Sequence, residues 1–134
     1  MGMGVGGFSG TDSLLSRGER RRMVTDMTLL QKRDLARRRR RLEVYLDTRA
    51  RLRAALAQLM PGNRVIVFGS LTRPGVFNDR SDVDLALPGS PPPVDPLELA
   101  AQLMERLARP VDVVRLDRCR FRQKIRLEGE EWTI

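Results

Sequence analysis

The sequence predicts one small α/β (α+β) domain, built on a mixed sheet of three or four strands that is flanked by helices. Three short runs at 64–68, 81–87 and 111–116 are rich in apolar and β-branched residues, which is typical of strands. Helical patterns lie before the first run, between the second and third, and after the third. With 134 residues, of which 41% are hydrophobic, the chain can bury one core and is too short for two ordinary domains.

Composition divides the chain into three segments. Residues 1–24 are rich in glycine and then in charge, which predicts a disordered N-terminal segment. Residues 25–60 predict a basic amphipathic helical arm that ends at Pro61-Gly62, and residues 61–134 form the expected core. The apolar stripe expected along the arm consists of Leu35, Leu42, Leu46, Leu52, Leu56 and Leu59.

The elements of the core follow from local patterns. Residues 64–68 form an unbroken apolar run, typical of a buried strand, and residues 81–87 alternate polar and apolar side chains, typical of a half-buried strand. A proline-rich loop at 88–96 precedes a helix at 97–108 and a third strand at 111–116. Asp117 is expected to cap a last helix that ends near Gly129. The apolar face expected for the helix at 97–108 consists of Leu97, Ala100, Ala101, Met104, Leu107 and Ala108.

Several classes of site are excluded because the sequence has no histidine and one cysteine, Cys119. A disulfide framework, a Cys/His zinc site and a Ser–His or Cys–His nucleophile all need residues that the chain lacks. Any chemistry must come from carboxylates, hydroxyls, backbone groups and arginine. The sequence contains no apolar run long enough for a membrane span and no recognisable export signal, so the cytoplasm is the expected compartment.

The net charge of +8 belongs to the first 60 residues. Residues 1–60 hold 14 Lys and Arg against 6 Asp and Glu, whereas residues 61–134 hold 11 of each kind. The run from Arg37 to Arg41 sweeps around the whole helix, at about 100° per residue, so its members cannot all face one partner. A solvated face is the first interpretation, and contact with RNA or with an acidic partner surface is the alternative.

Three carboxylates are candidates for a metal site. Asp82 and Asp84 are two residues apart on a predicted strand, so both project from one face while Val83 projects into the core. Asp112 lies within an apolar strand, where a carboxylate needs a partner or a metal. Mg²⁺ prefers hard oxygen ligands and completes its shell with water and phosphates. The alternatives are an acid pair on a solvated strand and an Asp112 that caps a helix or pairs with arginine.

A candidate phosphate site lies where the first predicted strand ends. Gly69 permits close approach of an anion to the backbone, and the Ser70 hydroxyl and the following amides can donate to phosphate oxygens. Arg73, three residues further on, can reach the same phosphates.

Gly69-Ser70, eleven intervening residues and then Asp82-Val83-Asp84 together resemble the signature of the polymerase-β-type nucleotidyltransferases. The resemblance is closest to the minimal nucleotidyltransferases (the MNT family), whose members often act as antitoxins beside a HEPN-domain toxin. It covers about 85 residues and includes Asp112 and the segment 125–129, which is similar to a closing Ile-x-x-Glu-Gly. Two departures stand near the turn, because Leu71 replaces an arginine and Pro74 is inserted before Gly75.

The resemblance implies the polymerase-β-type fold and a role for each site residue. Asp82 and Asp84 would hold Mg²⁺ against the nucleotide phosphates, and Asp112 would complete a two-metal site or deprotonate the attacking hydroxyl. Gly69 and Ser70 would cradle the β- and γ-phosphates. The implied reaction transfers a nucleotidyl group, AMP from ATP, to a hydroxyl of a partner protein, with a HEPN-domain toxin as the expected partner.

Two other functions and one geometric expectation remain to be tested. A catalytically weak or inactive module could neutralise its partner by binding alone, or residues 17–53 could bind nucleic acid. Trp132 is expected either to pack the C-terminal tail onto the domain or to contact a partner. The mechanism requires the carboxyl groups of Asp82, Asp84 and Asp112 to lie on one face of the sheet, within about 8 Å of one another, facing Gly69-Ser70.

Overall fold

The computed structural model of the chain describes residues 27–134, so the predictions for residues 1–24 and for the first residues of the arm lie outside it. Residues 37–134 form one compact unit, and residues 27–36 belong to another. In the latter, α3 (Leu29–Leu59) begins with a reciprocal cap. The amide of Gln31 donates to Thr28 Oγ1 at 3.1 Å, and the Thr28 amide donates to Gln31 Oε1 at 2.9 Å.

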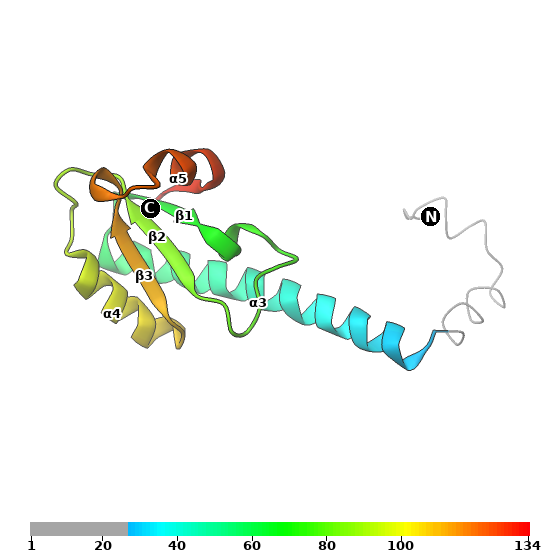
Figure 1. Cartoon of the computed structure of the whole chain (residues 1–134). Coiled ribbons are helices and arrows are strands. Elements are labelled where there is room, and N and C mark those ends of the chain that lie inside the picture. The colour runs from blue at the N-terminus through cyan, green and yellow to red at the C-terminus, as the bar shows by residue number, and fades with distance from the viewer. Residues whose placement is uncertain (1–26) are drawn as a thin grey trace, which may run out of the picture. The chain divides into compact units, whose positions relative to one another are not determined.

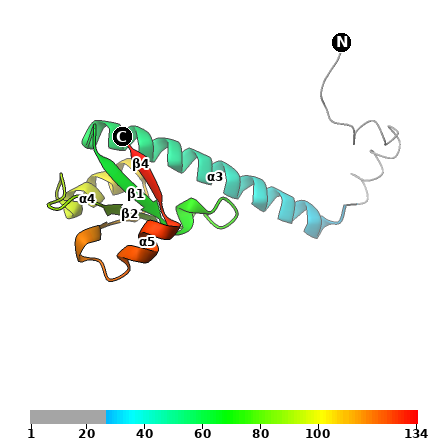
Figure 2. The ribbon, with the colours of Figure 1, turned by 90° about the horizontal axis from the view of Figure 1, so that it is seen from above.

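Four strands form one mixed sheet in the order β3-β2-β1-β4; Figure 1 shows β3, β2 and β1 side by side, and Figure 2 shows β4 next to β1. The strands are β1 (Arg64–Phe68), β2 (Val83–Leu87), β3 (Val111–Arg115) and β4 (Glu130–Thr133). β1 pairs antiparallel with β2 and β4, whereas β2 and β3 are parallel and are connected through α4 (Pro96–Leu107). A crossover helix is the usual connection between parallel neighbours. The predicted α+β class is therefore confirmed.

The larger core lies between one face of the sheet and the helices α3 and α4 (Figure 1). Alternation along the strands sends every second apolar side chain to this face. The strand residues of this core are Val65, Val67, Val83, Leu85, Leu87, Val111 and Val113. The helix residues packed on them include Val44, Leu52, Leu56, Leu99, Leu103 and Leu107.

Both expected helix faces were partly wrong. In α3, Leu35, Leu42 and Leu46 are exposed, and Val44 and Thr48 are buried instead. In α4, the exposed side chains of Leu97 and Met104 were expected to be buried, and Leu99 and Leu103 fill the core in their place. The physical reason is that each helix meets the sheet along a different strip of its surface from the one that its leucine or methionine spacing favours. These differences concern the helix faces only and do not affect which strands pair in the sheet.

The opposite face of the sheet carries a smaller apolar cluster beneath α5 (Arg122–Glu128) (Figures 1 and 2). Ile66 and Ala86 contribute from β1 and β2, Leu116 from the 3₁₀ helix η2 (Leu116–Arg118), and Ile125 from α5. This small cluster holds α5 over one part of the sheet, next to the strand positions that carry the candidate carboxylates.

The C-terminal residues differ from the sequence prediction in two ways. Asp117 does not cap α5; it accepts hydrogen bonds from Arg115 Nε at 3.1 Å and from Ser90 Oγ at 2.9 Å. The helix ends at Gly129 as predicted, and the chain then adds β4 beside β1 (Figure 2). Trp132 on β4 is buried in the larger core, which confirms that it packs the tail onto the domain. In the described part of the chain, no helix has the length and apolar character needed to span a membrane.

Candidate functional site

The turn after β1 brings its backbone against a carboxylate of β2. Gly69 opens the 3₁₀ helix η1 (Gly69–Thr72) with a φ of +73°, a conformation that side chains with a Cβ rarely adopt. A Cβ placed on Gly69 would lie 2.6 Å from Asp84 Oδ2. The strand register explains this proximity, because Phe68, the last residue of β1, pairs with Asp84. The backbone conformation therefore favours glycine, and a Cβ at this position would also have to displace the end of the Asp84 side chain.

Asp84 and Asp112 are direct partners on the parallel strands β2 and β3. Residues in register on adjacent strands project from the same face, so both carboxylates lie on the face opposite the larger core. Val83 and Val111 project into that core, as the alternation predicts. Asp82 immediately precedes β2 and is exposed. The fold thus places all three candidate acids at one end of two neighbouring strands.

Electrostatic repulsion acts on the central carboxylate. Burial raises the pKa of Asp84 above the ordinary value for aspartate, and the negative charges of Asp112 and Asp82 raise it further. No described residue donates a hydrogen bond to the Asp84 carboxylate or forms an ion pair with it. A half-buried carboxylate beside two others, without a cationic partner among residues 27–134, fits a place where a cation binds.

The carboxylates fit a cation that takes part of its shell from a ligand. Mg²⁺ usually takes one or two hard oxygen donors from a protein and completes its shell with water and phosphate, and the paired residues Asp84 and Asp112 carry oxygens of this kind. Within residues 27–134, however, no group of three or more acidic or cysteine side chains is arranged to hold a metal ion. The expected set of Asp82, Asp84 and Asp112 is therefore no preformed metal cage.

A cleft of about 490 Å³ extends from the turn and Asp112 toward α5, and Asp82 and Asp84 are not among its lining residues. Gly69, Ser70, Arg73 and Asp112 line it, and this end carries the predicted phosphate-binding residues. The remaining lining residues come from β1, the loop after η1, β3, and the segment that leads into and forms α5: Phe68, Val76, Val114, Cys119, Phe121, Lys124, Ile125 and Glu128. Its volume is within the range of small-molecule sites, which is about 300–1,000 Å³.

The fold is similar to that of a chain in a solved structure. That structure is described as "Crystal structure of the toxin-antitoxin with AMP-PNP", and the two chains superpose with a TM-score of 0.51 and 25% sequence identity. The match covers 63% of this chain and 73% of the other. The sequence matches no protein-family model and no curated protein sequence.

The departure at Leu71 has a structural explanation. Its side chain is fully buried in the larger core, and its carbonyl accepts a hydrogen bond from Arg49 Nη1 at 2.9 Å. Arg49 also pairs with Glu130 at 2.6 Å, and this arginine lowers the pKa of the Glu130 carboxyl. Leu71 thus anchors η1 to the core, while Arg73 is exposed and lines the cleft. Arg73 remains the cationic side chain that η1 offers to a phosphate.

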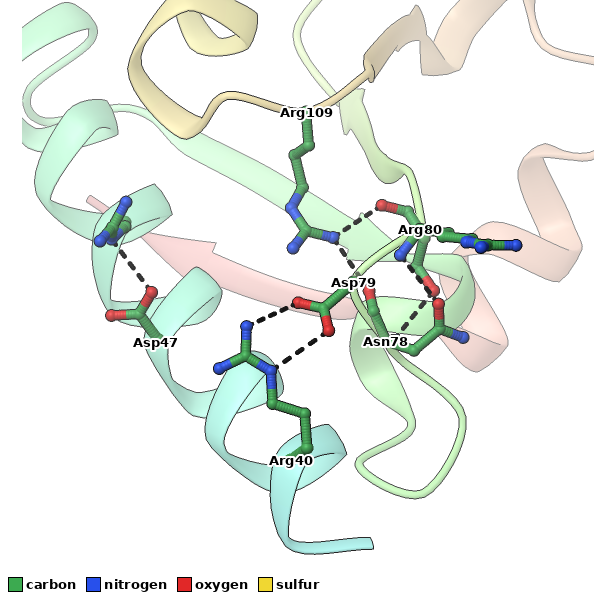
Figure 3. A network of polar contacts seen from close by, with 8 residues as sticks. Arg40, Asp47, Asn78, Asp79, Arg80 and Arg109 are labelled. Atoms are coloured by element: carbon green, nitrogen blue, oxygen red, sulfur yellow. Dashed lines mark hydrogen bonds and ion pairs between the residues drawn. The ribbon is translucent and has the colours of Figure 1, made fainter. Parts of the chain in front are cut away.

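A polar network holds the loop between η1 and β2 (Figure 3). Arg109, which follows α4, donates from Nη1 to the carbonyls of Ser81 at 2.7 Å and Asn78 at 3.1 Å. Its guanidinium also lies 4.7 Å from the centre of the Phe77 ring, which is fully buried. Burial lowers the pKa of the Arg109 guanidinium, because the charged form loses part of its solvation there. Arg109 therefore fixes the backbone directly before Asp82.

The arginine run on α3 contributes to the same network. Arg40 forms a two-bond pair with Asp79, with Nη2–Oδ1 at 2.9 Å and Nε–Oδ2 at 3.2 Å (Figure 3). Arg40 therefore holds the loop, although the run was expected to form a solvated face. The pair is exposed, so it contributes less than the buried contacts of Arg109.

Sequence reasoning missed the side chains that α5 presents to the cleft. Phe121, Lys124, Ile125 and Glu128 follow one another at steps of three, one and three residues, which places them on one side of a helix. That spacing is the signal that could have found them. It points to a site wall only when the position of α5 over the sheet is known.

Proposed function

We propose that the protein is a nucleotidyltransferase that transfers AMP from ATP to a hydroxyl group of a partner protein, as the antitoxin of a HEPN/MNT pair. The observation that carries the proposal is that Gly69 and Asp112 line one end of a cleft, while Asp84 lies against Gly69 and pairs in register with Asp112. The similarity to a chain from a toxin–antitoxin structure that contains AMP-PNP, an analogue of ATP, supports the nucleotide and the kind of partner.

The turn and the cationic side chains bind the triphosphate in this proposal. The Ser70 hydroxyl and the amides of η1 donate to phosphate oxygens, which the left-handed Gly69 allows to approach the backbone closely. Arg73 and Lys124 line the same cleft and neutralise phosphate charge. Neither side chain forms an ion pair with another described residue, so both are free to bind the ligand.

Asp82, Asp84 and Asp112 act as the catalytic carboxylates. Asp82 and Asp84 would hold Mg²⁺, and the ion would supply charge neutralisation on the phosphates. The acceptor oxygen attacks the α-phosphorus, the bond from that phosphorus to the β-phosphate oxygen breaks, and pyrophosphate leaves. Asp112 accepts the proton of the attacking hydroxyl. Positioning and electrostatic stabilisation provide the rate enhancement, since the chain has no histidine for acid–base catalysis.

Labelling of the partner tests the transferase directly. The full chain, labelled ATP, Mg²⁺ and the partner protein are expected to give a labelled partner, and Asp82→Ala is expected to abolish the label. Asp47→Asn is a matched control, because Asp47 is a surface acid of α3 that pairs with Arg51 at 3.0 Å, away from the cleft. Equal labelling by the wild type and Asp82→Ala would exclude the proposed mechanism.

A second candidate function is neutralisation of the partner by binding alone. It is favoured by one observation, that residues 27–134 contain no preformed group of three acids able to hold a metal ion. The double variant Asp82→Ala/Asp84→Ala separates the two candidates. A scaffold keeps its neutralising effect in that variant, whereas a transferase loses it together with partner labelling.

A further inference from the structure

The cleft changes character along the strands of its floor. At the level of Gly69 the strands present Asp84 and Asp112, which are partners in register. Two residues along, the same face presents the partners Ala86 and Val114, and Ile66 lies beside Ala86. Of these residues, Asp112 and Val114 of β3 line the cleft, whereas Ile66 and Ala86 are buried beneath α5. Along β3 the lining therefore passes from a carboxylate to an apolar side chain within about 7 Å, which is the rise of two strand residues.

α5 covers the apolar level. Ile125 packs on Ile66 and Ala86, which fixes the helix over this part of the sheet. Glu128, at the end of α5, also lines a neighbouring pocket with Gly69 and Arg73, so the C-terminal end of α5 lies near the phosphate turn. Phe121 is seven residues earlier, about 10 Å along a helix axis. Phe121 therefore lines the end of the cleft that is far from Glu128 and the phosphate turn.

Phe121 is the exposed aromatic side chain of this cleft. It is 65% exposed, and no described guanidinium or aromatic ring stacks on it. Leu127, on the same helix, is 85% exposed but lines none of the described pockets. The cleft therefore offers an unstacked ring and apolar side chains at one end and the phosphate-binding turn at the other. This arrangement fits a ligand that has a flat apolar part at one end and negative charge at the other.

We propose that Phe121 forms a stacking platform for the nucleobase of the bound nucleoside triphosphate, with Val114 and Ile125 forming the apolar end of the same subsite. This inference rests on the proposed function, because it places the triphosphate at Gly69-Ser70. The base lies toward the N-terminal end of α5 and over Val114. Each base offers a flat face to an aromatic ring, so the subsite contributes affinity for nucleotides in general.

Calorimetric titration of the full chain tests the subsite with two probes in the presence of Mg²⁺. ATP carries a base and a triphosphate, whereas inorganic tripolyphosphate carries the phosphate part alone. Phe121→Ala is expected to weaken ATP binding at least about tenfold, which equals about 1.4 kcal/mol, and to leave tripolyphosphate binding within about twofold of the wild type. Phe121→Tyr keeps the ring and Leu127→Ala is the matched control on α5; both are expected to bind ATP as the wild type does.

The outcomes separate this subsite from the proposed function. If Phe121→Ala binds ATP as tightly as the wild type, the base does not stack on Phe121 and the proposal fails, while nucleotide binding stands. Equal weakening of ATP and tripolyphosphate also overturns it, because the variant then disturbs the turn or the fold. A wild-type chain that binds neither probe overturns the proposed function, and this subsite with it.

Discussion

The carboxylate of Asp84 lies so close to Gly69 that a Cβ on the glycine would stand 2.6 Å from Asp84 Oδ2. This relationship joins the phosphate-binding turn to the carboxylate pair, because β1 and β2 are hydrogen-bonded neighbours and Phe68 is in register with Asp84. The turn and the central acid therefore form one structural unit. Any side chain at position 69 must displace the carboxylate, the turn or both.

Gly69→Ala is expected to damage both stability and nucleotide binding. Gly62→Ala is the matched control, because Gly62 has a similar φ of +78° but nothing within 4 Å of its added Cβ. The left-handed backbone alone costs a residue with a Cβ about 1 kcal/mol, which is the expected loss for Gly62→Ala. Gly69→Ala is expected to lose about 1–3 kcal/mol more from overpacking. Urea unfolding followed by circular dichroism measures both, and equal losses would contradict the contact.

Asp84→Asn is expected to raise the melting temperature at pH 7. The pKa of Asp84 is raised in the folded chain by burial and by the charges of Asp112 and Asp82. Because the folded pKa is raised, ionising Asp84 costs more free energy in the folded chain than in the unfolded chain. The stability that the protonated carboxyl contributes is therefore complete below the ordinary aspartate pKa of about 3.9, and it is lost as the pH rises through the folded pKa. The asparagine variant does not ionise and avoids that loss.

The pH dependence distinguishes this effect from a general one. The difference in melting temperature between Asp84→Asn and the wild type should shrink as the pH falls from 7 toward 4, in a metal-free buffer. Asp47→Asn removes a surface acid paired with Arg51 and should bring no gain. An Asp84→Asn variant that is less stable than the wild type at pH 7 would show that the carboxylate is stabilised by its surroundings.

Arg109→Ala is expected to destabilise the chain by about 2–4 kcal/mol. The variant loses two charged hydrogen bonds to the carbonyls of Ser81 and Asn78, and it leaves the Phe77 ring without its cation. The matched control is Arg106→Ala on α4, where an exposed guanidinium donates to Gln58 and the expected change is within about 0.5 kcal/mol. Hydrogen exchange should rise in residues 73–82 of the Arg109 variant, and an unchanged exchange rate there would exclude its role in holding the loop.

The central part of the site could be predicted from the sequence because each signal is local. Alternation along 81–87 determines which face Asp82 and Asp84 share, and the apolar run around Asp112 identifies a second buried strand. Gly69-Ser70 follows directly from the end of a strand. Such patterns depend on a few neighbouring residues, so they do not depend on where the helices pack against the sheet.

The cleft wall and the helix faces could not be predicted, because they depend on where each helix packs. The spacing of Leu35, Leu42 and Leu46 is regular, yet the sheet meets α3 along another strip that includes Val44 and Thr48. Phe121 lines the cleft because α5 is held over Ile66 and Ala86, a contact between segments far apart in the sequence. Local periodicity carries no information on such contacts.

Trp132→Ala is expected to cost about 3–5 kcal/mol, because the ring is 5% exposed and fills the larger core from the edge strand β4. The guanidinium of Arg53 lies 4.2 Å from the ring centre and that of Arg49 lies 5.2 Å away, so two cations of α3 also lose this contact, although Arg49 keeps the Tyr45 ring at 4.9 Å. Trp132→Phe keeps a ring between β1 and α3 and should lose less than half as much. Urea unfolding followed by circular dichroism measures both variants, with Leu127→Ala as an exposed control. A small loss of unfolding free energy for Trp132→Ala would contradict this expectation, because it would mean that the packing of β4 contributes little to the stability of the fold.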